Sequence, residues 1–117
     1  MVTGSSRKSV ERVLTSDLAS NFDVVITADD VSRSKPDPEP FVRAAEKMCV
    51  QASECLVVEN APFGIHAART AGCEVVGLCT TLAPEDLCEA NWIALDHQEL
   101  ETLLCTGTTQ PESGDRA

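Results

Sequence analysis

Short runs of apolar residues alternate along this chain with stretches whose apolar residues recur at helical spacing. The runs predict strands at 24–27, 55–58, 74–78 and 92–94, with Val2 as the end of a further strand. Helical stripes and capping residues predict helices at 8–18, 38–48, 62–71, 85–90 and 98–104. Strands that alternate with helices indicate an α/β fold, with a doubly wound parallel sheet and helices on both faces.

The stretch 56–72 gives the clearest local signals. Its opening apolar run predicts a strand buried on both faces, and Gly72 ends the following helix as a left-handed cap. Glu59 and Asn60 stand at the carboxyl end of that strand, where open α/β sheets bind ligands. Their oxygens suit Mg²⁺. A solvated loop carboxylate and an ordinary helix N-cap explain the two residues equally well.

Three polar segments each follow a predicted strand: the turn at residues 3–5, the loop that carries Lys35, and the Glu59-Asn60 pair. Because the carboxyl ends of parallel strands meet at one edge of a sheet, we expect the three segments to converge. A hydroxyl with backbone N–H groups, a lysine and metal-binding oxygens together predict a site for a phosphoryl group. When each residue is considered alone, Thr3 is also explained as a helix cap, and Lys35 is also explained as a solvated loop lysine.

Composition and charge limit the number of domains and the classes of partner. A chain of 117 residues allows one small domain, which we place at 1–105, followed by a disordered acidic tail at 106–117. The formal charge of −10 argues against nucleic acid and anionic membranes as partners. No apolar run reaches the ~18 residues that span a bilayer, and we recognise no secretory signal.

The six cysteines contain no C-x-x-C pair. Because several of them lie in or beside strand-like runs, buried free thiols explain them better than disulfides, which indicates a reducing, cytoplasmic compartment. Neither His66 nor His97 completes a recognisable zinc cluster.

Three motifs, in order along the chain, resemble those of one enzyme family. The segment Val2-Thr3-Gly4-Ser5 is similar to the second motif of that family, and 34–38 with Phe41 is similar to the third. The segment 58–64 and the small residues after it are similar to the fourth. The family is that of the haloacid dehalogenase-like hydrolases, in the branch of phosphoglucomutase-like and sugar-phosphate phosphatase members. The resemblance covers residues 2–104 and corresponds to the C-terminal part of the family's Rossmann-like fold.

The resemblance implies a Mg²⁺-dependent phosphatase or phosphomutase that acts on small phosphorylated metabolites through an aspartyl-phosphate. By that resemblance, Thr3 hydrogen-bonds the transferred phosphoryl group, and Gly4 lies beside it in the phosphate-binding turn. Lys35 is the catalytic lysine that pairs with the nucleophilic carboxylate and the phosphoryl oxygens. Glu59 helps to hold Mg²⁺, and Asn60 stands where many members carry a second aspartate.

The sequence holds no Asp-x-Asp pair, the motif whose first aspartate attacks phosphorus in this family and whose second acts as general acid and base. Asp29-Asp30 are adjacent, and Asp37 with Glu39 opens a helix, so neither pair ends a strand before Thr3. The helical cap that selects the substrate in the family also has no counterpart here. We therefore expect these residues alone to be inactive.

The family's first strand lies in the middle of the sheet, between the strand that ends at Val2 and the strand that ends at Val58. Its absence from this chain predicts two inner edges with unpaired backbone groups. We therefore expect the isolated chain to be marginally stable, to borrow a strand from a partner, or to oligomerise through its exposed sheet edges.

Three functional hypotheses stay open at this point. The chain is part of a phosphatase or phosphomutase whose nucleophile lies in other sequence, or it is a truncated product or pseudoenzyme that binds phosphate or a protein. The third hypothesis, a phosphate-binding or response-regulator-like module, explains the sheet but leaves the ordered motifs unexplained.

Overall fold

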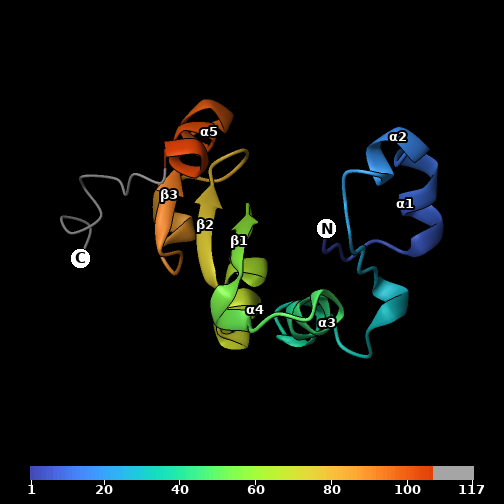
Figure 1. Ribbon diagram of the computed structural model, residues 1–117. Coiled ribbons are helices and arrows are strands. Elements are labelled where there is room, and N and C mark those ends of the chain that lie inside the picture. The colour runs from blue at the N-terminus through green and yellow to red at the C-terminus, as the bar shows by residue number, and fades with distance from the viewer. Residues whose placement is uncertain (107–117) are drawn as a thin grey trace.

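The computed structural model describes residues 1–106, and its centre is a three-stranded parallel sheet in the order β1-β2-β3 (Figure 1). The strands are β1 (Leu56–Glu59), β2 (Glu74–Leu78) and β3 (Trp92–Ala94). The α-helices are α1 (Arg7–Val13), α2 (Ser16–Ala19), α3 (Glu39–Met48), α4 (Pro62–Ala71) and α5 (His97–Thr106). Short 3₁₀ turns lie at η1 (Ala28–Asp30), η2 (Ala52–Glu54) and η3 (Pro84–Leu87).

The helix α4 covers one face of the sheet. Ile65, Ala67 and Ala68 are completely buried in a core that also contains Val75 of β2 and Phe41 of α3. Small residues let the helix approach the strands closely, so that little apolar surface stays in contact with water. The predicted helix at 62–71 is thereby confirmed as α4.

The helix α5 covers the other face. Its Leu100 and Leu103 pack against a separate cluster formed by Val76, Leu78 and Ala94. Helices therefore lie on both faces of a parallel sheet, which confirms the predicted doubly wound α/β fold.

The end of α4 is set by Gly72, as predicted. Gly72 has a φ of 100°, in the left-handed region, and its backbone N–H donates to the carbonyls of Ala68 and Arg69. A residue with a Cβ adopts this conformation only with strain, so glycine is the residue that suits this cap.

The predicted helix at 8–18 is two helices. The residue after α1, Leu14, is extended, and the Thr15 hydroxyl then accepts a hydrogen bond from the Leu18 N–H to start α2. The hydrogen bond to the Thr15 hydroxyl starts a new helix in place of continuing the first one. The spacing of hydrophobic residues does not show such a break, so the sequence predicted one helix.

The predicted strand at 24–27 is reduced to one parallel bridge, between Val2 and Ile26. Ile26 and Thr27 are completely buried, as a strand prediction requires. The only neighbour that pairs with them within residues 1–106 is the short segment Met1–Thr3, so no longer ladder forms.

The strand β1 is not buried on both faces, contrary to the prediction. Leu56 is 47% exposed and Val58 is 39% exposed. In the described part of the chain β1 pairs only with β2, and the α5 cluster lies over β2 and β3. No described strand lies between β1 and the Val2–Ile26 bridge, which agrees with the predicted open position in the sheet.

Smaller differences concern ends of elements. The predicted helix at 85–90 is the 3₁₀ turn η3, and α3 begins at Glu39 with Pro38 as its N-cap. Helix α5 includes Thr106, the first residue of the predicted tail, and 107–117 lie outside the described residues. Within residues 1–106, no helix has the length and apolar character needed to cross a membrane.

None of the six cysteines forms a disulfide, as predicted, but only Cys73 is buried. Burial and the neighbouring Cys55 raise the pKa of the Cys73 thiol to about 11, so this thiol stays protonated at neutral pH.

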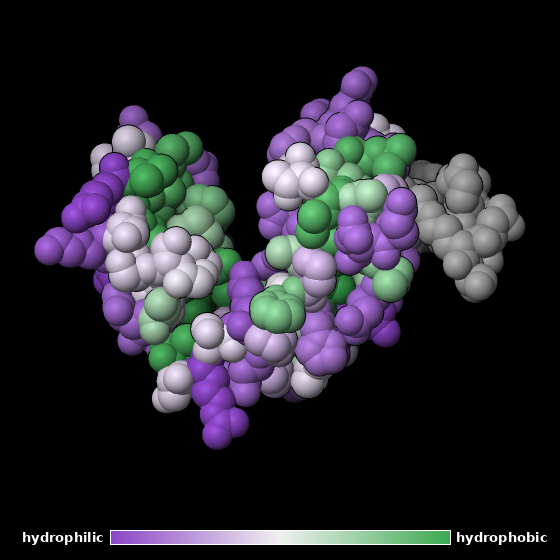
Figure 2. Space-filling view, turned by 180° about the vertical axis from the view of Figure 1, so that it is seen from behind, coloured by the Kyte–Doolittle hydropathy of each residue, from purple (hydrophilic) through white to green (hydrophobic). Residues whose placement is uncertain are grey.

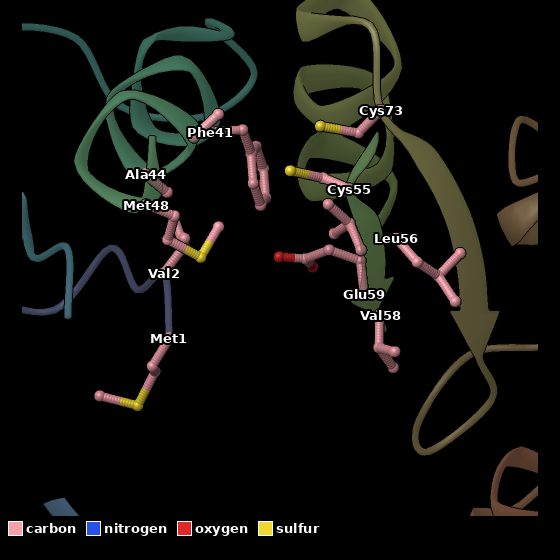
Figure 3. A pocket seen from close by; sticks show the side chains of 12 residues that line it. Met1, Val2, Phe41, Ala44, Met48, Cys55, Leu56, Val58, Glu59 and Cys73 are labelled. Carbon is pink, nitrogen blue, oxygen red and sulfur yellow. The ribbon is translucent and has the colours of Figure 1, made fainter. Parts of the chain in front are cut away.

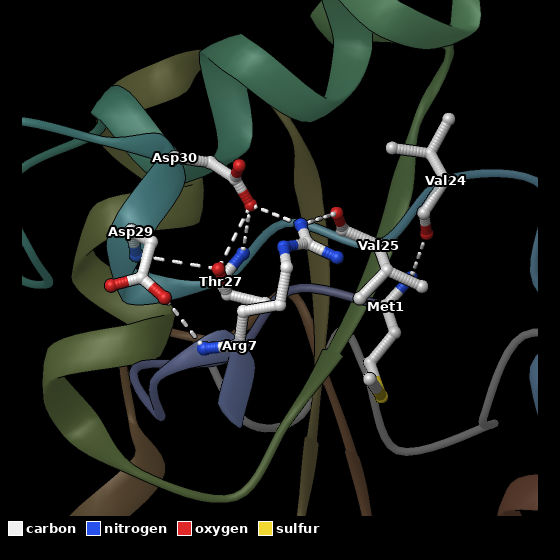
Figure 4. A network of polar contacts seen from close by, with 7 residues as sticks. All are labelled: Met1, Arg7, Val24, Val25, Thr27, Asp29 and Asp30. Carbon is white, nitrogen blue, oxygen red and sulfur yellow. Dashed lines mark hydrogen bonds and ion pairs between the residues drawn. The ribbon is translucent and has the colours of Figure 1, made fainter. Parts of the chain in front are cut away.

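A polar network ties α1 to the segment that contains Ile26 (Figure 4). The Asp30 carboxylate accepts hydrogen bonds from the Thr27 N–H at 2.8 Å and the Thr27 hydroxyl at 2.9 Å. Arg7 pairs with the same carboxylate at 2.7 Å, and its backbone N–H donates to Asp29. The hydrogen bonds from Thr27, helped by Arg7, lower the pKa of Asp30 from 3.8 to about 2.

Replacement of a core residue tests the packing of α4. We expect Ile65→Ala to lower the free energy of unfolding by about 2–5 kcal/mol, because it removes a buried side chain and leaves a cavity. Phe63→Ala is the control, since Phe63 belongs to the same helix and is 66% exposed. Urea denaturation followed by Trp92 fluorescence measures both; equal effects of the two variants would contradict the described packing.

Acid titration tests the Asp30 network. Because the pKa of Asp30 is lower in the folded chain than in the unfolded chain, its stabilising effect is complete above about pH 4. The effect is lost as the pH falls towards 2, so we expect Asp30→Asn to weaken the chain at pH 7 and to flatten its loss of stability below pH 4. Exposed Asp23→Asn is the control, and urea midpoints between pH 7 and pH 2 give the comparison. An unchanged slope for Asp30→Asn would overturn the assignment.

Candidate functional site

Lys35 is held between two oxygens that come from distant parts of the chain. Its Nζ donates to Oε1 of Glu59 at 2.5 Å and to the backbone carbonyl of Val2 at 3.4 Å. The ammonium also lies 5.1 Å from the centroid of the Phe41 ring, within the range of a cation–π contact. Only 19% of its side chain is exposed, so the explanation of Lys35 as a solvated loop lysine is wrong.

The loop that carries Lys35 is anchored by Glu39 at the start of α3. The backbone N–H groups of Ser32 and Arg33 donate to the Glu39 carboxylate at 3.0 Å and 2.9 Å. These hydrogen bonds, with that from Ser32 as the largest cause, lower the pKa of Glu39. The N-cap of α3 is Pro38, one residue later than the predicted Asp37, and the Asp37 carboxylate accepts a hydrogen bond from the Glu39 N–H at 2.9 Å.

Glu59 points from the carboxyl end of β1 towards the first turn of α4. Its side chain is 12% exposed, so it is not a solvated loop carboxylate. Gly64 is packed against this side chain, because a Cβ at position 64 would overlap the Glu59 carboxylate. Glycine therefore makes room for the carboxylate, and Lys35 neutralises its charge.

The turn at residues 3–5 follows the Val2–Ile26 bridge. The Thr3 hydroxyl accepts a hydrogen bond from the Ser5 N–H at 3.1 Å, and the Thr3 N–H donates to the Ile26 carbonyl. The cap of α1 is Ser6, so Thr3 is not the helix cap. Apart from the adjacent residues Thr3 and Ser5, no atom lies within 4 Å of a Cβ placed on Gly4, which leaves this side of the turn open to a ligand.

Asn60 is joined to the loop after β2. Its Nδ2 donates to the Thr80 hydroxyl at 3.1 Å, a bond that does not use the amide oxygen. The N-cap of α4 is Ala61, so the alternative role of Asn60 as N-cap is wrong. Sequence reasoning missed Thr80 as a neighbour of the site, because Thr80 and Asn60 belong to different strand–helix units. The signal that could have found Thr80 is its position after a strand, β2.

Lys35 therefore joins Glu59 to the carbonyl of Val2, the residue that precedes Thr3. Asn60 follows Glu59 at the same edge of the sheet. The two acidic pairs of the sequence have other partners. Asp29 and Asp30 bind Arg7 and Thr27, and Asp37 accepts from the Glu39 N–H at the start of α3. In residues 1–106 no group of three His, Cys, Asp or Glu side chains is placed to hold a metal ion.

Comparison with known proteins agrees with this geometry. The family model for haloacid dehalogenase-like hydrolases matches residues 1–78. Validoxylamine A 7′-phosphate phosphatase of Streptomyces hygroscopicus subsp. limoneus is 46% identical over 101 residues, which cover 86% of this chain and 47% of that protein. Fructose-1-phosphate phosphatase of Escherichia coli (strain K12) is 44% identical over 75 residues, which cover 63% of this chain and 40% of the relative.

Among solved structures, the β-phosphoglucomutase of Clostridium difficile superposes with a TM-score of 0.67 at 25% identity. The match covers 78% of this chain and 42% of that one. The chain thus spans less than half the length of these three proteins. The matched motifs and the parallel sheet lead to one assignment: the chain belongs to the haloacid dehalogenase-like hydrolases, in the branch of phosphoglucomutases and sugar-phosphate phosphatases.

Proposed function

We propose that this chain provides the phosphoryl-binding part of a phosphatase or phosphomutase that acts on small phosphorylated metabolites. The observation that carries the proposal is the position of Lys35, whose largely buried ammonium lies between Glu59 and the carbonyl that precedes Thr3. Two relatives are named as phosphatases of small phosphorylated compounds, which supports this class of substrate.

The residues around Lys35 have the groups that a phosphoryl site needs. The Lys35 ammonium would neutralise phosphoryl oxygens and the attacking carboxylate. The Thr3 oxygen accepts from Ser5, so its O–H is directed elsewhere and would donate to a phosphoryl oxygen. The open side of Gly4 would let that oxygen approach the backbone.

Glu59 and Asn60 would hold Mg²⁺. One carboxylate and one amide oxygen fit this ion, which usually takes one or two carboxylates and completes its shell with water and substrate phosphate. Lys35 already binds Glu59, so the ammonium and the ion would share the carboxylate. Bound Mg²⁺ would add positive charge that stabilises the transferred phosphoryl group.

An aspartyl-phosphate route needs a carboxylate that attacks phosphorus. The sequence has no Asp-x-Asp pair, and Asp29 and Asp30 are bound to Arg7 and Thr27. We therefore assign the nucleophile to a segment other than these 117 residues. The same observation favours a second candidate, a non-catalytic protein that binds phosphate without turnover.

Titration with inorganic phosphate, followed by ³¹P NMR in the presence of Mg²⁺, tests the binding site. We expect Lys35→Ala to weaken phosphate binding about tenfold or more, because a hydrogen bond to a charged group contributes about 1.5–3 kcal/mol. Lys47→Ala is the matched control, since Lys47 is an exposed lysine of α3. Circular dichroism verifies that each variant is folded; a folded wild-type chain that binds no phosphate would contradict the proposal.

Turnover of a generic phosphomonoester by the same sample tests the nucleophile assignment. We expect none from this chain alone. Turnover that Lys35→Ala abolishes would show that a carboxylate of these residues attacks phosphorus, and the assignment to another segment would be wrong.

A further inference from the structure

A cleft of about 250 Å³ separates the segment Met1–Val2 from β1 (Figure 3). Two of the residues that line it are cysteines, Cys55 and Cys73. Seen from behind, the surface is hollowed between the part that carries α1 and α2 and the part that carries the sheet (Figure 2). The cleft therefore gives a small molecule a way to this pair of thiols.

The two cysteines are partners in the register of the sheet. Cys55 directly precedes β1, and Cys73 directly precedes β2. Leu56 pairs with Glu74 in the parallel ladder of these strands. The Glu74 N–H also donates to the Cys55 carbonyl at 3.2 Å, which extends the register back to Cys55 and Cys73. The two residues therefore lie opposite each other on adjacent strands.

Both side chains lie on the face of the sheet that α4 covers. Successive side chains of a strand alternate between its two faces, so Cys55 shares a face with Val57. For the same reason Cys73 shares a face with Val75, and all four residues belong to the core below α4 or pack against it. Figure 3 shows both sulfur atoms directed towards Phe41 of α3.

The separation of the two residues suits a disulfide bond. Adjacent strands lie about 4.8 Å apart, and disulfides join residues whose Cα atoms are about 4.4–6.8 Å apart. The two thiols already affect each other, because Cys55 is, after burial, the next cause that raises the pKa of the Cys73 thiol. A bond between the sulfur atoms therefore requires no change in strand pairing.

The pairing is specific to these two cysteines. Within residues 1–106, the register of the three strands places no other two cysteines opposite each other. The remaining four lie in or beside α3, β2, η3 and α5, and three of them are exposed. They are Cys49, Cys79, Cys88 and Cys105.

We infer that Cys55 and Cys73 form a redox-active dithiol, which a low-molecular-weight disulfide oxidises to an intramolecular disulfide. Cys55 is half-buried and reacts first, whereas Cys73 is only 4% exposed. The Cys55 thiolate attacks one sulfur of the reagent, and the other half of the reagent leaves as a thiolate. Cys73 then loses its proton to water, its sulfur attacks the Sγ of Cys55, and the second half of the reagent leaves. Two protein thiols become one disulfide, and the reagent is reduced to two thiols.

The bond ties down the strand that carries Glu59. Within residues 1–106, β1 pairs only with β2, and its carboxyl end is held by the ion pair between Glu59 and Lys35. A disulfide at the amino end joins β1 to β2 covalently, so β1 separates from the sheet less often. In a reducing compartment the bond is transient, as redox-sensing disulfides are. Neither thiol takes part in the proposed phosphoryl site, so the reaction is independent of the proposed function.

Treatment of the full 117-residue chain with oxidised 2-mercaptoethanol tests the inference. Unreacted thiols are then blocked with iodoacetamide. A protease that cleaves after glutamate puts each cysteine into a separate peptide, with Cys55 in 55–59 and Cys73 in 60–74. We expect mass spectrometry of the unreduced digest to find these two peptides joined, and reduction to release them. Joined peptides from any other pair, or reagent bound to both cysteines without a link between them, would overturn the inference.

Matched variants test the order of the two steps. We expect Cys73→Ala to retain one half of the reagent on Cys55, because the thiol that would displace it is gone. We expect Cys55→Ala to slow the reaction of Cys73 about tenfold or more, because a buried thiol with a raised pKa forms little thiolate. Cys88→Ala is the control, since Cys88 is exposed in another element and its loss should leave the bond unchanged. Circular dichroism verifies that each variant is folded; a Cys73 that reacts as fast without Cys55 would contradict this order.

Hydrogen exchange measures the effect on the sheet. The hydrogen bond from the Glu74 N–H to the Cys55 carbonyl opens when β1 separates from β2. We therefore expect the Glu74 amide to exchange more slowly in the oxidised chain than in the reduced chain. The Thr3 amide is the control, because it donates to Ile26 and not to the sheet. An equal rate at Glu74 in both forms would contradict a link between β1 and β2.

Discussion

The ion pair between Lys35 and Glu59 is the constraint on which the arrangement of the site depends. Two charges that are less than one-fifth exposed are costly to bury unless each finds a partner. The pair meets this requirement only when the loop before α3, the end of β1 and the Val2 carbonyl lie together. Glycine at position 64 is part of the same requirement, because it leaves space for the carboxylate.

The elements that sequence reasoning predicted best are those whose signals are local. The strand β2, the helix α4 and the cap at Gly72 depend on residues within one short stretch, so pattern and propensity suffice to locate them. The convergence of Lys35 with Glu59 was predictable for a different reason. Parallel strands bring their carboxyl ends to one edge, whatever the details of the loops.

The features that sequence reasoning missed depend on contacts between distant residues. The run 55–58 looks like a fully buried strand, but the exposure of Leu56 and Val58 is decided by which strand lies next to β1. The Arg7–Asp30 pair joins residues that no periodicity relates. The break in the first helix depends on competition between a Thr15 cap and a continuing helix, which differ by small energies.

The helices α1 and α2 contain no buried residue, and this has a consequence for how the chain loses its structure. Val13 is 77% exposed and Leu18 is 51% exposed, whereas the residues of α4 that face the sheet are fully covered. Opening of α1 and α2 therefore exposes little new apolar surface, and opening of α4 dismantles the main core. We therefore expect two cooperative units, an N-terminal one that opens at low free-energy cost and a sheet unit that opens only in global unfolding.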